Sequence, residues 1–267
     1  MSKDPIVPNH PDRRFRIKVC GVRRPQDLVA CAEAGVDAIG WNLYPPSVRF
    51  VDADSQAVRA MGRQAAELGL YQVGVFVNET SDAICRAAEH LGLDAVQLHG
   101  DESPELAYSL ASRGYCVVRA VRLPGGELEV EQIQTVIGDW AEAPVDLLLD
   151  ADPGTGFGGG GRRLDWDSIA QWAKRQASEP ERTSGPERTS GPEQTGPEET
   201  SGGDLRGWIL AGGLSPENVA EAIGRSGALA VDVASGVEQP RGVKSSERIA
   251  AFAHACRLAF EKPTPGR

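Results

Sequence analysis

The sequence has no run approaching the roughly 20 consecutive apolar residues that a membrane-spanning helix needs. It has no Cys-x-x-Cys pair and no secretory leader, and its five cysteines are widely spread along the chain. These absences argue against a membrane-embedded protein and against a small secreted domain held together by disulfides. We therefore expect a cytoplasmic protein whose thiols are reduced and mostly buried.

Patterns for metal and nucleotide binding are also missing. The four histidines are not paired at ligand spacing, and no cluster of carboxylates of the two-metal kind occurs. No GxxxxGK[ST] segment is present, which argues against a nucleotide-type phosphate loop. The formal net charge of -10 repels nucleic acid and anionic membranes. The sequence thus predicts no metal, nucleic-acid or membrane partner, and it leaves room for a local site that binds a small anion.

What is present is an ordinary globular composition, with 40% hydrophobic and 25% charged residues in 267 positions. From residue 16 onward, short apolar runs alternate eight times with segments of helical periodicity. The expected strands are 16–20, 37–43, 72–76, 94–98, 115–121, 145–149, 207–211 and 229–233. The expected helices are 25–34, 53–68, 81–91, 103–112, 128–137, 166–174, 216–223 and 246–260, with Pro25, Pro104 and Pro216 in first turns.

Eight strand–helix units in this length favour a single (β/α)₈ TIM barrel over an open doubly wound sheet. The barrel is expected to span residues 16–260, between a flexible N-terminal extension (1–15) and a C-terminal tail (261–267). Residues 178–203 interrupt it with tandem copies of Glu-Arg-Thr-Ser-Gly-Pro that contain no large apolar side chain. Such a repeat cannot bury enough surface to offset its ordering entropy, so we expect a disordered loop between the sixth helix and the seventh strand.

Chemically distinctive residues stand where the expected strands end, at the mouth where barrel enzymes place their functional groups. Cys20 ends the first strand on the same face as Lys18, a setting that favours the thiolate if that face is the barrel interior. Gln97 and His99 share a face at the end of the fourth strand. Asp150 ends the sixth strand; Asp165 is better placed than Asp150 to cap the helix that follows.

Anion-binding features follow three other strands. Arg49 comes after the second strand, beside a Pro-stiffened loop, and is suited to a substrate carboxylate. Small residues follow the seventh strand (Gly212 and Gly213) and the eighth (Ser235 and Gly236), where barrels often bind phosphate through backbone N–H groups. The two segments together indicate a phosphorylated small-molecule substrate.

Taken in order, the motifs resemble those of phosphoribosylanthranilate isomerase, an enzyme family of tryptophan biosynthesis. The resemblance runs from about residue 16 to 258, with the repeat as its interruption. It is carried by KVCG (18–21), GVDAIG (35–40), YPPSVR (44–49), VGVFVN (73–78), VQLHGDE (96–102), LLD (148–150), DW (165–166), GGLSPEN (212–218) and VDVASGVE (231–238).

The resemblance implies an Amadori rearrangement of N-(5-phosphoribosyl)anthranilate to 1-(2-carboxyphenylamino)-1-deoxyribulose 5-phosphate, without cofactor or metal. By motif match, Cys20 would be the general base and Asp150 the general acid. The implied substrate-binding residues are Arg49 at the anthranilate carboxylate, Gly212, Gly213, Ser235 and Gly236 at the phosphate, and in addition Gln97, His99 and Asp232. The resemblance names no neighbouring pathway enzyme as a partner.

Three departures from the family pattern stand out. Val48 replaces a Pro and leaves Arg49 in place, and Gly159-Gly-Gly-Arg162 stands where the family often has Gly-(Ser/Thr)-Gly-Lys. Ala234 replaces a common Ser and removes one hydroxyl from the expected phosphate site. We expect the glycine-rich loop 154–161 to close over Asp150 and exclude water.

Two other functions remain open from the sequence. A related sugar isomerisation of histidine biosynthesis uses a similar barrel with a pair of aspartates, but Cys20 stands where that reaction needs Asp. A noncatalytic phosphate-binding barrel, with the repeat recruiting a partner, needs neither Cys20 nor Asp150.

Deletion of residues 178–203 tests the interpretation of the repeat. We expect isomerase activity and melting temperature to stay close to those of the full chain, because the repeat buries no apolar surface. A large loss of either quantity would show that the repeat contributes to the barrel or to its chemistry.

Overall fold

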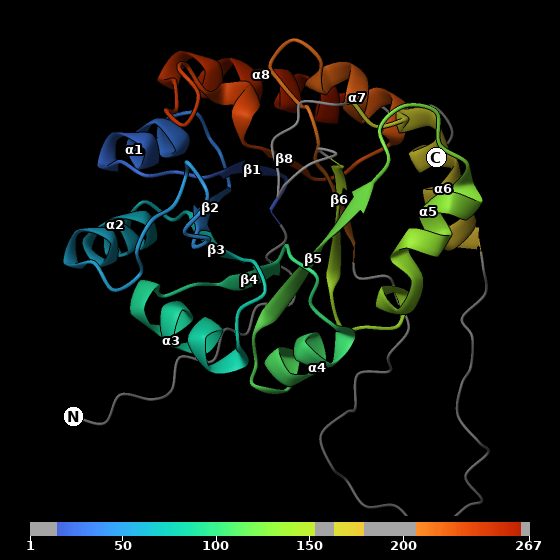
Figure 1. Ribbon diagram of the computed structural model, residues 1–267. Helices are drawn as coiled ribbons and strands as arrows, with labels where there is room; N and C mark the ends of the chain where they lie inside the picture. The colour runs from blue at the N-terminus through green and yellow to red at the C-terminus, as the bar shows by residue number, and fades with distance from the viewer. Residues whose placement is uncertain (1–14, 153–162, 179–206, 263–267) are drawn as a thin grey trace, which may run out of the picture.

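The computed structural model describes residues 15–152, 163–178 and 207–262, and it has the predicted architecture (Figure 1). Eight parallel strands form one closed barrel in chain order, and β8 pairs with β1 to complete it. The helices lie around the outside of the strands. The segment 179–206, which holds almost all of the repeat, falls between α6 and β7 in the chain; like the N-terminal extension and most of the tail, it lies outside the described residues.

The strands are β1 (Ile17–Cys20), β2 (Ala38–Asn42), β3 (Tyr71–Phe76), β4 (Ala95–Leu98), β5 (Cys116–Leu123), β6 (Asp146–Ala151), β7 (Trp208–Leu210) and β8 (Val231–Val233). The helices are α1 (Pro25–Glu33), α2 (Gln56–Glu67), α3 (Ser81–Leu91), α4 (Pro104–Ser112), α5 (Val130–Ile137), α6 (Trp166–Ser178), α7 (Val219–Ser226) and α8 (Ser246–Glu261). Short 3₁₀ helices follow α5 (η1, Gly138–Ala141) and β8 (η2, Ser235–Val237).

The seventh helix begins three residues later than predicted. Pro25 and Pro104 do open α1 and α4, but Pro216 lies in a turn three residues before α7. The Asn218 side chain accepts a hydrogen bond from the Ser215 N–H (2.8 Å) and donates one to the Gly213 carbonyl (2.9 Å). These bonds give the turn its own hydrogen-bonded structure, so the helix begins only after it.

The strands divide their side chains between two apolar cores, as period-two alternation requires. Leu147 and Leu149 of β6 belong to the large core between strands and helices, whereas Leu148 belongs to a small cluster inside the barrel. Residue 150 has the same parity as Leu148 and therefore points toward the barrel axis at the mouth. The alternation that the sequence shows thus decides which side chains reach the mouth.

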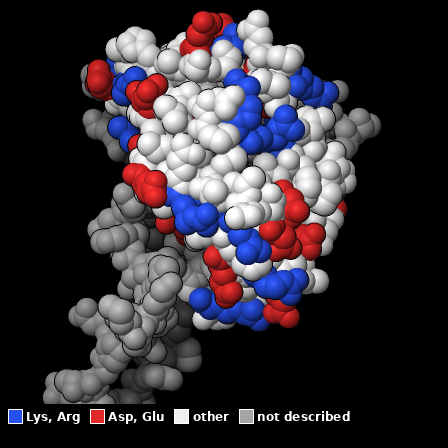
Figure 2. All heavy atoms as spheres, turned by 90° about the vertical axis from the view of Figure 1, so that its left-hand side faces the viewer, with Lys and Arg blue, Asp and Glu red and all other residues white. Residues whose placement is uncertain are grey.

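The outer surface carries charged side chains of both signs. Figure 2 views the face formed by α1, α2 and α3, at the left in Figure 1, where Lys and Arg side chains are interspersed with Asp and Glu. Among the described residues, no helix combines the length and apolar character that crossing a bilayer requires.

Among the glycines that the structure describes, Gly236 leaves the least space for a side chain. A Cβ atom there would lie 1.9 Å from the Leu214 carbonyl oxygen, so two mouth loops meet at this glycine. We expect Gly236→Ala to lower the free energy of unfolding by about 1–3 kcal/mol in urea denaturation.

Gly224→Ala is the matched control, because Gly224 is exposed on α7 and a Cβ atom there would meet no atom within 4 Å. This control should be neutral or stabilising by up to about 1 kcal/mol. Equal stabilities for the two variants would contradict the predicted clash between the loops.

Candidate active site

A cavity at the carboxyl ends of the strands contains nine of the ten residues predicted to act or bind. They come from six different strands or the loops that follow them, and they are Cys20, Arg49, Gln97, His99, Asp150, Gly212, Gly213, Asp232 and Ser235. The tenth, Gly236, does not line the cavity and instead packs against the backbone of Leu214.

A fully buried ammonium lies beneath this cavity. Lys18 Nζ, inside the barrel, is 2.9 Å from Asp232 Oδ1 and donates a hydrogen bond to Gln97 Oε1 at 3.1 Å. Burial by itself lowers the pKa of Lys18, but the Asp232 carboxylate and the nearby Cys20 thiol raise it, and the net direction is upward. Lys18 is therefore a permanent positive charge in the barrel interior.

Cys20 stands on the interior face with Lys18, as predicted, and Lys18 does favour the thiolate. Burial nevertheless raises the pKa of the Cys20 thiol, and Asp232 also raises it; Lys18, Lys244 and Arg49 act in the opposite direction without reversing it. Burial is the largest of these influences. The site without substrate therefore holds Cys20 as the thiol.

The space for the Cys20 sulfur is provided by a glycine on the neighbouring strand. Cys20 of β1 pairs with Gly40 of β2, and a Cβ atom on Gly40 would lie 2.8 Å from Cys20 Sγ. The next residue, Gly21, has a φ of +79°, and a Cβ atom there would lie 2.4 Å from Cδ of Arg49. Two glycines thus let the thiol and the Arg49 side chain share one corner of the mouth.

Hydrogen bonds run from Lys18 through Gln97 to His99 in a fixed direction. Because an ammonium has no acceptor, Gln97 must turn its oxygen toward Lys18 and its NH₂ toward His99. The amide Nε2 lies 2.8 Å from His99 Nδ1, which therefore accepts, so the proton of a neutral imidazole is on Nε2. That nitrogen lies 3.5 Å from Asp150 Oδ2.

Asp150 is held at the tip of β6 and does not cap a helix. Its Oδ1 accepts a hydrogen bond from the Ala151 N–H at 2.9 Å, and its side chain stays partly exposed to the cavity. Asp165 caps α6, as predicted, because its Oδ1 accepts from the N–H groups of Asp167 (3.2 Å) and Ser168 (3.3 Å). The loop 154–161, expected to close over Asp150, lies outside the described residues.

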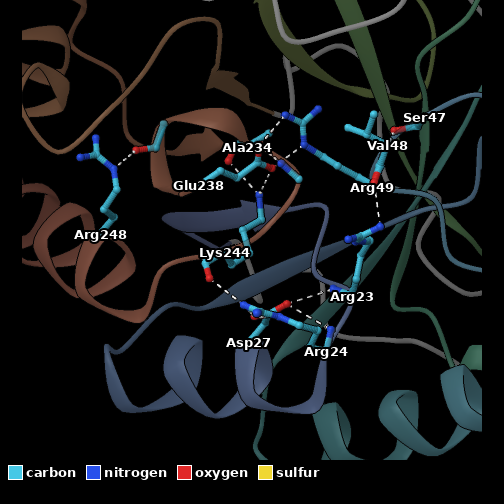
Figure 3. Close-up of polar contacts among 12 residues, drawn as sticks. Arg23, Arg24, Asp27, Ser47, Val48, Arg49, Ala234, Glu238, Lys244 and Arg248 are labelled. Atoms are coloured by element: carbon cyan, nitrogen blue, oxygen red, sulfur yellow. Dashed lines mark hydrogen bonds and ion pairs between the residues drawn. The ribbon is translucent and has the colours of Figure 1, made fainter. Parts of the chain in front are cut away.

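Arg49 enters the cavity as half of a buried ion pair (Figure 3). Its Nε and Nη2 donate to Glu238 Oε1 and Oε2 at 2.6 and 2.9 Å. Lys244 Nζ donates to the same carboxylate at 2.9 Å and to the Ala234 carbonyl at 2.8 Å. In Figure 3 the Arg49 and Lys244 side chains converge on Glu238 from different loops.

The Glu238 carboxylate accepts four hydrogen bonds, the last from the Gly242 N–H at 2.9 Å. Burial opposes its ionisation, but the bonds from Arg49, Lys244 and Gly242 outweigh burial and lower the pKa of Glu238 to about 2. The same environment lowers the pKa of Lys244, because burial acts on the ammonium more strongly than Glu238 does. Glu238 is accordingly an anion throughout the physiological range.

The small-residue loops after β7 and β8 have the backbone form expected of a phosphate site. Gly212 and Gly213 adopt φ values of +80° and +65°, which favour glycine, and a Cβ on Gly212 would lie 2.5 Å from the Ala151 backbone nitrogen. Ser235 begins η2 after β8, and Arg248 Nε donates to the Gly236 carbonyl at 2.9 Å. These contacts fix the two loops whose N–H groups are the predicted phosphate donors.

Sequence reasoning assigned no role to Asn42, Tyr44 and Ser47, which line the cavity, nor to Glu238 and Lys244. The alternation along β2 could have predicted Asn42, because Ala38, Gly40 and residue 42 share the interior face. Lys244 carries no such signal, since it pairs with Glu238 through an isolated antiparallel bridge outside the eight strands.

A family model described as N-(5'phosphoribosyl)anthranilate (PRA) isomerase matches residues 17–183 and 197–255. The chain belongs to this family. The N-(5'-phosphoribosyl)anthranilate isomerase of Myxococcus xanthus is 40% identical over 242 residues, which cover 91% of this chain and 96% of that relative. The family resemblance seen in the sequence is thereby confirmed, and the chain is an isomerase of tryptophan biosynthesis.

Solved structures of phosphoribosylanthranilate isomerases have the same fold. The Thermotoga maritima enzyme superposes with a TM-score of 0.70 at 30% identity and covers 92% of this chain and 100% of its own. A second crystal structure, of a phosphoribosylanthranilate isomerase in complex with reduced 1-(o-carboxyphenylamino)-1-deoxyribulose 5-phosphate, superposes with a TM-score of 0.68 at 29% identity and the same coverage.

The lowered pKa of Glu238 predicts how acid acts on the fold of this isomerase. A carboxyl group whose pKa falls from 4.5 to about 2 on folding stabilises the native state above pH 4.5, and this contribution is lost as the pH falls toward 2. We expect the free-energy difference between wild type and Glu238→Gln to shrink by on the order of 3 kcal/mol over that window. Urea denaturation at a series of pH values measures this difference, and a difference that is constant with pH would contradict the prediction.

Proposed function

We propose that the chain converts N-(5-phosphoribosyl)anthranilate to 1-(2-carboxyphenylamino)-1-deoxyribulose 5-phosphate, with Cys20 as general base and Asp150 as general acid. The observation that carries the proposal is that a thiol from β1 and a carboxyl group from β6 line one cavity. The two residues lie on strands on different sides of the barrel, so a substrate between them meets the base and the acid on different sides. The complex of a relative with a reduced form of the product supports this substrate.

In the first step, Asp150 donates its proton to the furanose ring oxygen, the bond from that oxygen to C1 breaks, and the nitrogen lone pair forms a protonated Schiff base at C1. Asp150 is left as a carboxylate whose Oδ2 lies 3.5 Å from His99 Nε2. This contact stabilises the charge that develops on the acid as its proton leaves. His99 thus supports the departure of the proton, and Gln97 and Lys18 keep the imidazole in the required tautomer.

In the second step, Cys20 removes the proton from C2, and the C–H electrons form the C1=C2 bond while the C=N electrons return to nitrogen. The resulting enolamine becomes the ketone by a proton shift. The empty site favours the thiol, so the base acts only once the thiolate has formed. The cations Lys18, Lys244 and Arg49 stabilise that thiolate, and the protonated Schiff base adds a further positive charge beside it.

The two ends of the substrate fit two features of the mouth. The ribose phosphate is assigned to the backbone N–H groups at Gly212, Gly213, Ser235 and Gly236, and the anthranilate carboxylate to Arg49. Gln97, His99 and Asp232 lie around Lys18 and Asp150. Their proposed role is to hold these two charged side chains in position rather than to bind the substrate directly.

Cys20→Ser and Asp150→Asn test the two chemical roles. We expect each variant to lose turnover by about 10²-fold or more, because a hydroxyl is a far weaker base than a thiolate and an amide cannot donate an acidic proton. KM should stay within a few-fold of wild type. Steady-state kinetics that follow the loss of phosphoribosylanthranilate fluorescence measure both constants.

Cys116→Ser is the matched control, because Cys116 is exposed at the start of β5, at the end of the barrel away from the mouth. It should leave turnover unchanged. Near-normal turnover of Cys20→Ser or Asp150→Asn would remove the role given to that residue.

The same assay, run in parallel on the aldose precursor of the histidine pathway, separates the alternative functions. Conversion of the histidine precursor alone would favour the related sugar isomerase. No conversion of either substrate would leave a phosphate-binding barrel as the function.

A further inference from the structure

The Arg49 guanidinium presents two edges, and only one of them is used by Glu238. The bonds to Glu238 come from Nε and Nη2, the side edge of the group. No described residue accepts a hydrogen bond from Nη1, although Arg49 lines the cavity. A guanidinium has five N–H donors in a rigid fork, so its end edge, Nη1 with the second hydrogen of Nη2, remains for another carboxylate.

The charges around Glu238 do not balance. Two cations, Arg49 and Lys244, meet one carboxylate, and the exposed fractions of the three side chains are only 9%, 1% and 1%. Desolvated charge of one sign is costly unless it meets its opposite, so this corner of the mouth favours an anion as its ligand. A carboxylate on the open edge of Arg49 supplies that missing charge.

Hydrogen bonds from three loops hold the cluster of Arg49, Glu238 and Lys244, so the Arg49 side chain has little freedom to rotate. Lys244 is tied through Nζ to the Ala234 carbonyl, and its own carbonyl accepts from Arg24 Nη2 at 2.6 Å. Arg23 Nη1 donates to the Val48 carbonyl at 2.8 Å, next to Arg49 in the chain (Figure 3). The loops after β1, β2 and β8 are thus bonded to one another around the Arg49–Glu238 pair.

We propose that Glu238 and Lys244 are positioning residues that aim the open edge of Arg49 at the carboxylate of the aryl amine and so set the specificity for a substrate that carries this carboxylate. The inference rests on the proposed function, since it assigns the anthranilate end of the substrate to Arg49. Neither positioning residue touches the reacting atoms; both act through Arg49.

A different role for Glu238 predicts the opposite result. If Glu238 were only a counterion that competes with the substrate for Arg49, its removal would free the guanidinium and strengthen carboxylate binding. If Glu238 positions Arg49, removal of Glu238 leaves the Arg49 guanidinium free to change orientation, and carboxylate binding weakens. The sign of the change therefore distinguishes the two roles.

The test measures the affinity of two ligands by calorimetric titration. One is reduced 1-(o-carboxyphenylamino)-1-deoxyribulose 5-phosphate, and the other is the same molecule with a phenyl group in place of the carboxyphenyl group. The ratio of their dissociation constants is the carboxylate preference. We expect Glu238→Gln to lower this preference about tenfold, the size of one charged hydrogen-bond contact, while binding of the phenyl ligand changes little.

Two further variants complete the experiment. Glu238→Gln/Lys244→Met removes one charge of each sign, so it preserves the net charge of the cluster and remains testable if the single variant does not fold. The carboxylate preference of this double variant should also fall about tenfold, whereas a counterion role predicts that the preference does not fall. Lys174→Met, on the exposed surface of α6, is the matched control and should bind both ligands as wild type does.

An unchanged or increased carboxylate preference in the folded Glu238 variants would overturn the positioning role, as would an equal loss of affinity for both ligands. Failure of the proposed function is seen separately in the wild type. It would convert no phosphoribosylanthranilate and would not prefer the carboxylate ligand.

Discussion

The fully buried Lys18 ammonium is the constraint around which the inside of the barrel is organised. An uncompensated charge at this depth would cost several kcal/mol or more, so the barrel must supply partners from other strands. Asp232 on the adjacent β8 provides the opposite charge, and Gln97 on β4 provides a neutral acceptor from across the interior. The three side chains join strands that are far apart in the sequence, and they form the floor of the cavity directly beneath Cys20.

The Lys18 charge also sets the orientation of the polar side chains that lie between it and Asp150. Since Lys18 can only donate, Gln97 and then His99 have no choice of orientation, and the His99 N–H ends opposite Asp150. On the other side, Lys18 acts on the Cys20 thiol two residues further along the same strand. The residues proposed as base and acid, on β1 and β6, are therefore both linked to Lys18, the first through its charge and the second through Gln97 and His99.

Much of this arrangement was predictable, because period-two alternation in a parallel barrel determines which residue at a strand end faces the axis. That rule placed Cys20 and Asp150 at one mouth. It did not reveal that Asp232 compensates Lys18, because charge compensation depends on distances across the barrel. It also did not account for the burial of Cys20, which outweighs the effect of Lys18 and favours the thiol. It missed Lys244 as well, which pairs with Glu238 through an isolated antiparallel bridge outside the eight strands.

This barrel holds two buried ionic groups, the Lys18–Asp232 pair and the Arg49–Lys244–Glu238 cluster, and they differ in net charge. Lys18 and Asp232 balance each other, so this pair needs no ligand and can form a permanent floor. Arg49, Lys244 and Glu238 retain one positive charge, which is the charge that the proposed carboxylate ligand would balance. The two groups also differ in position. The balanced pair lies on strands at the base of the cavity, whereas the unbalanced group lies in the loops that border it.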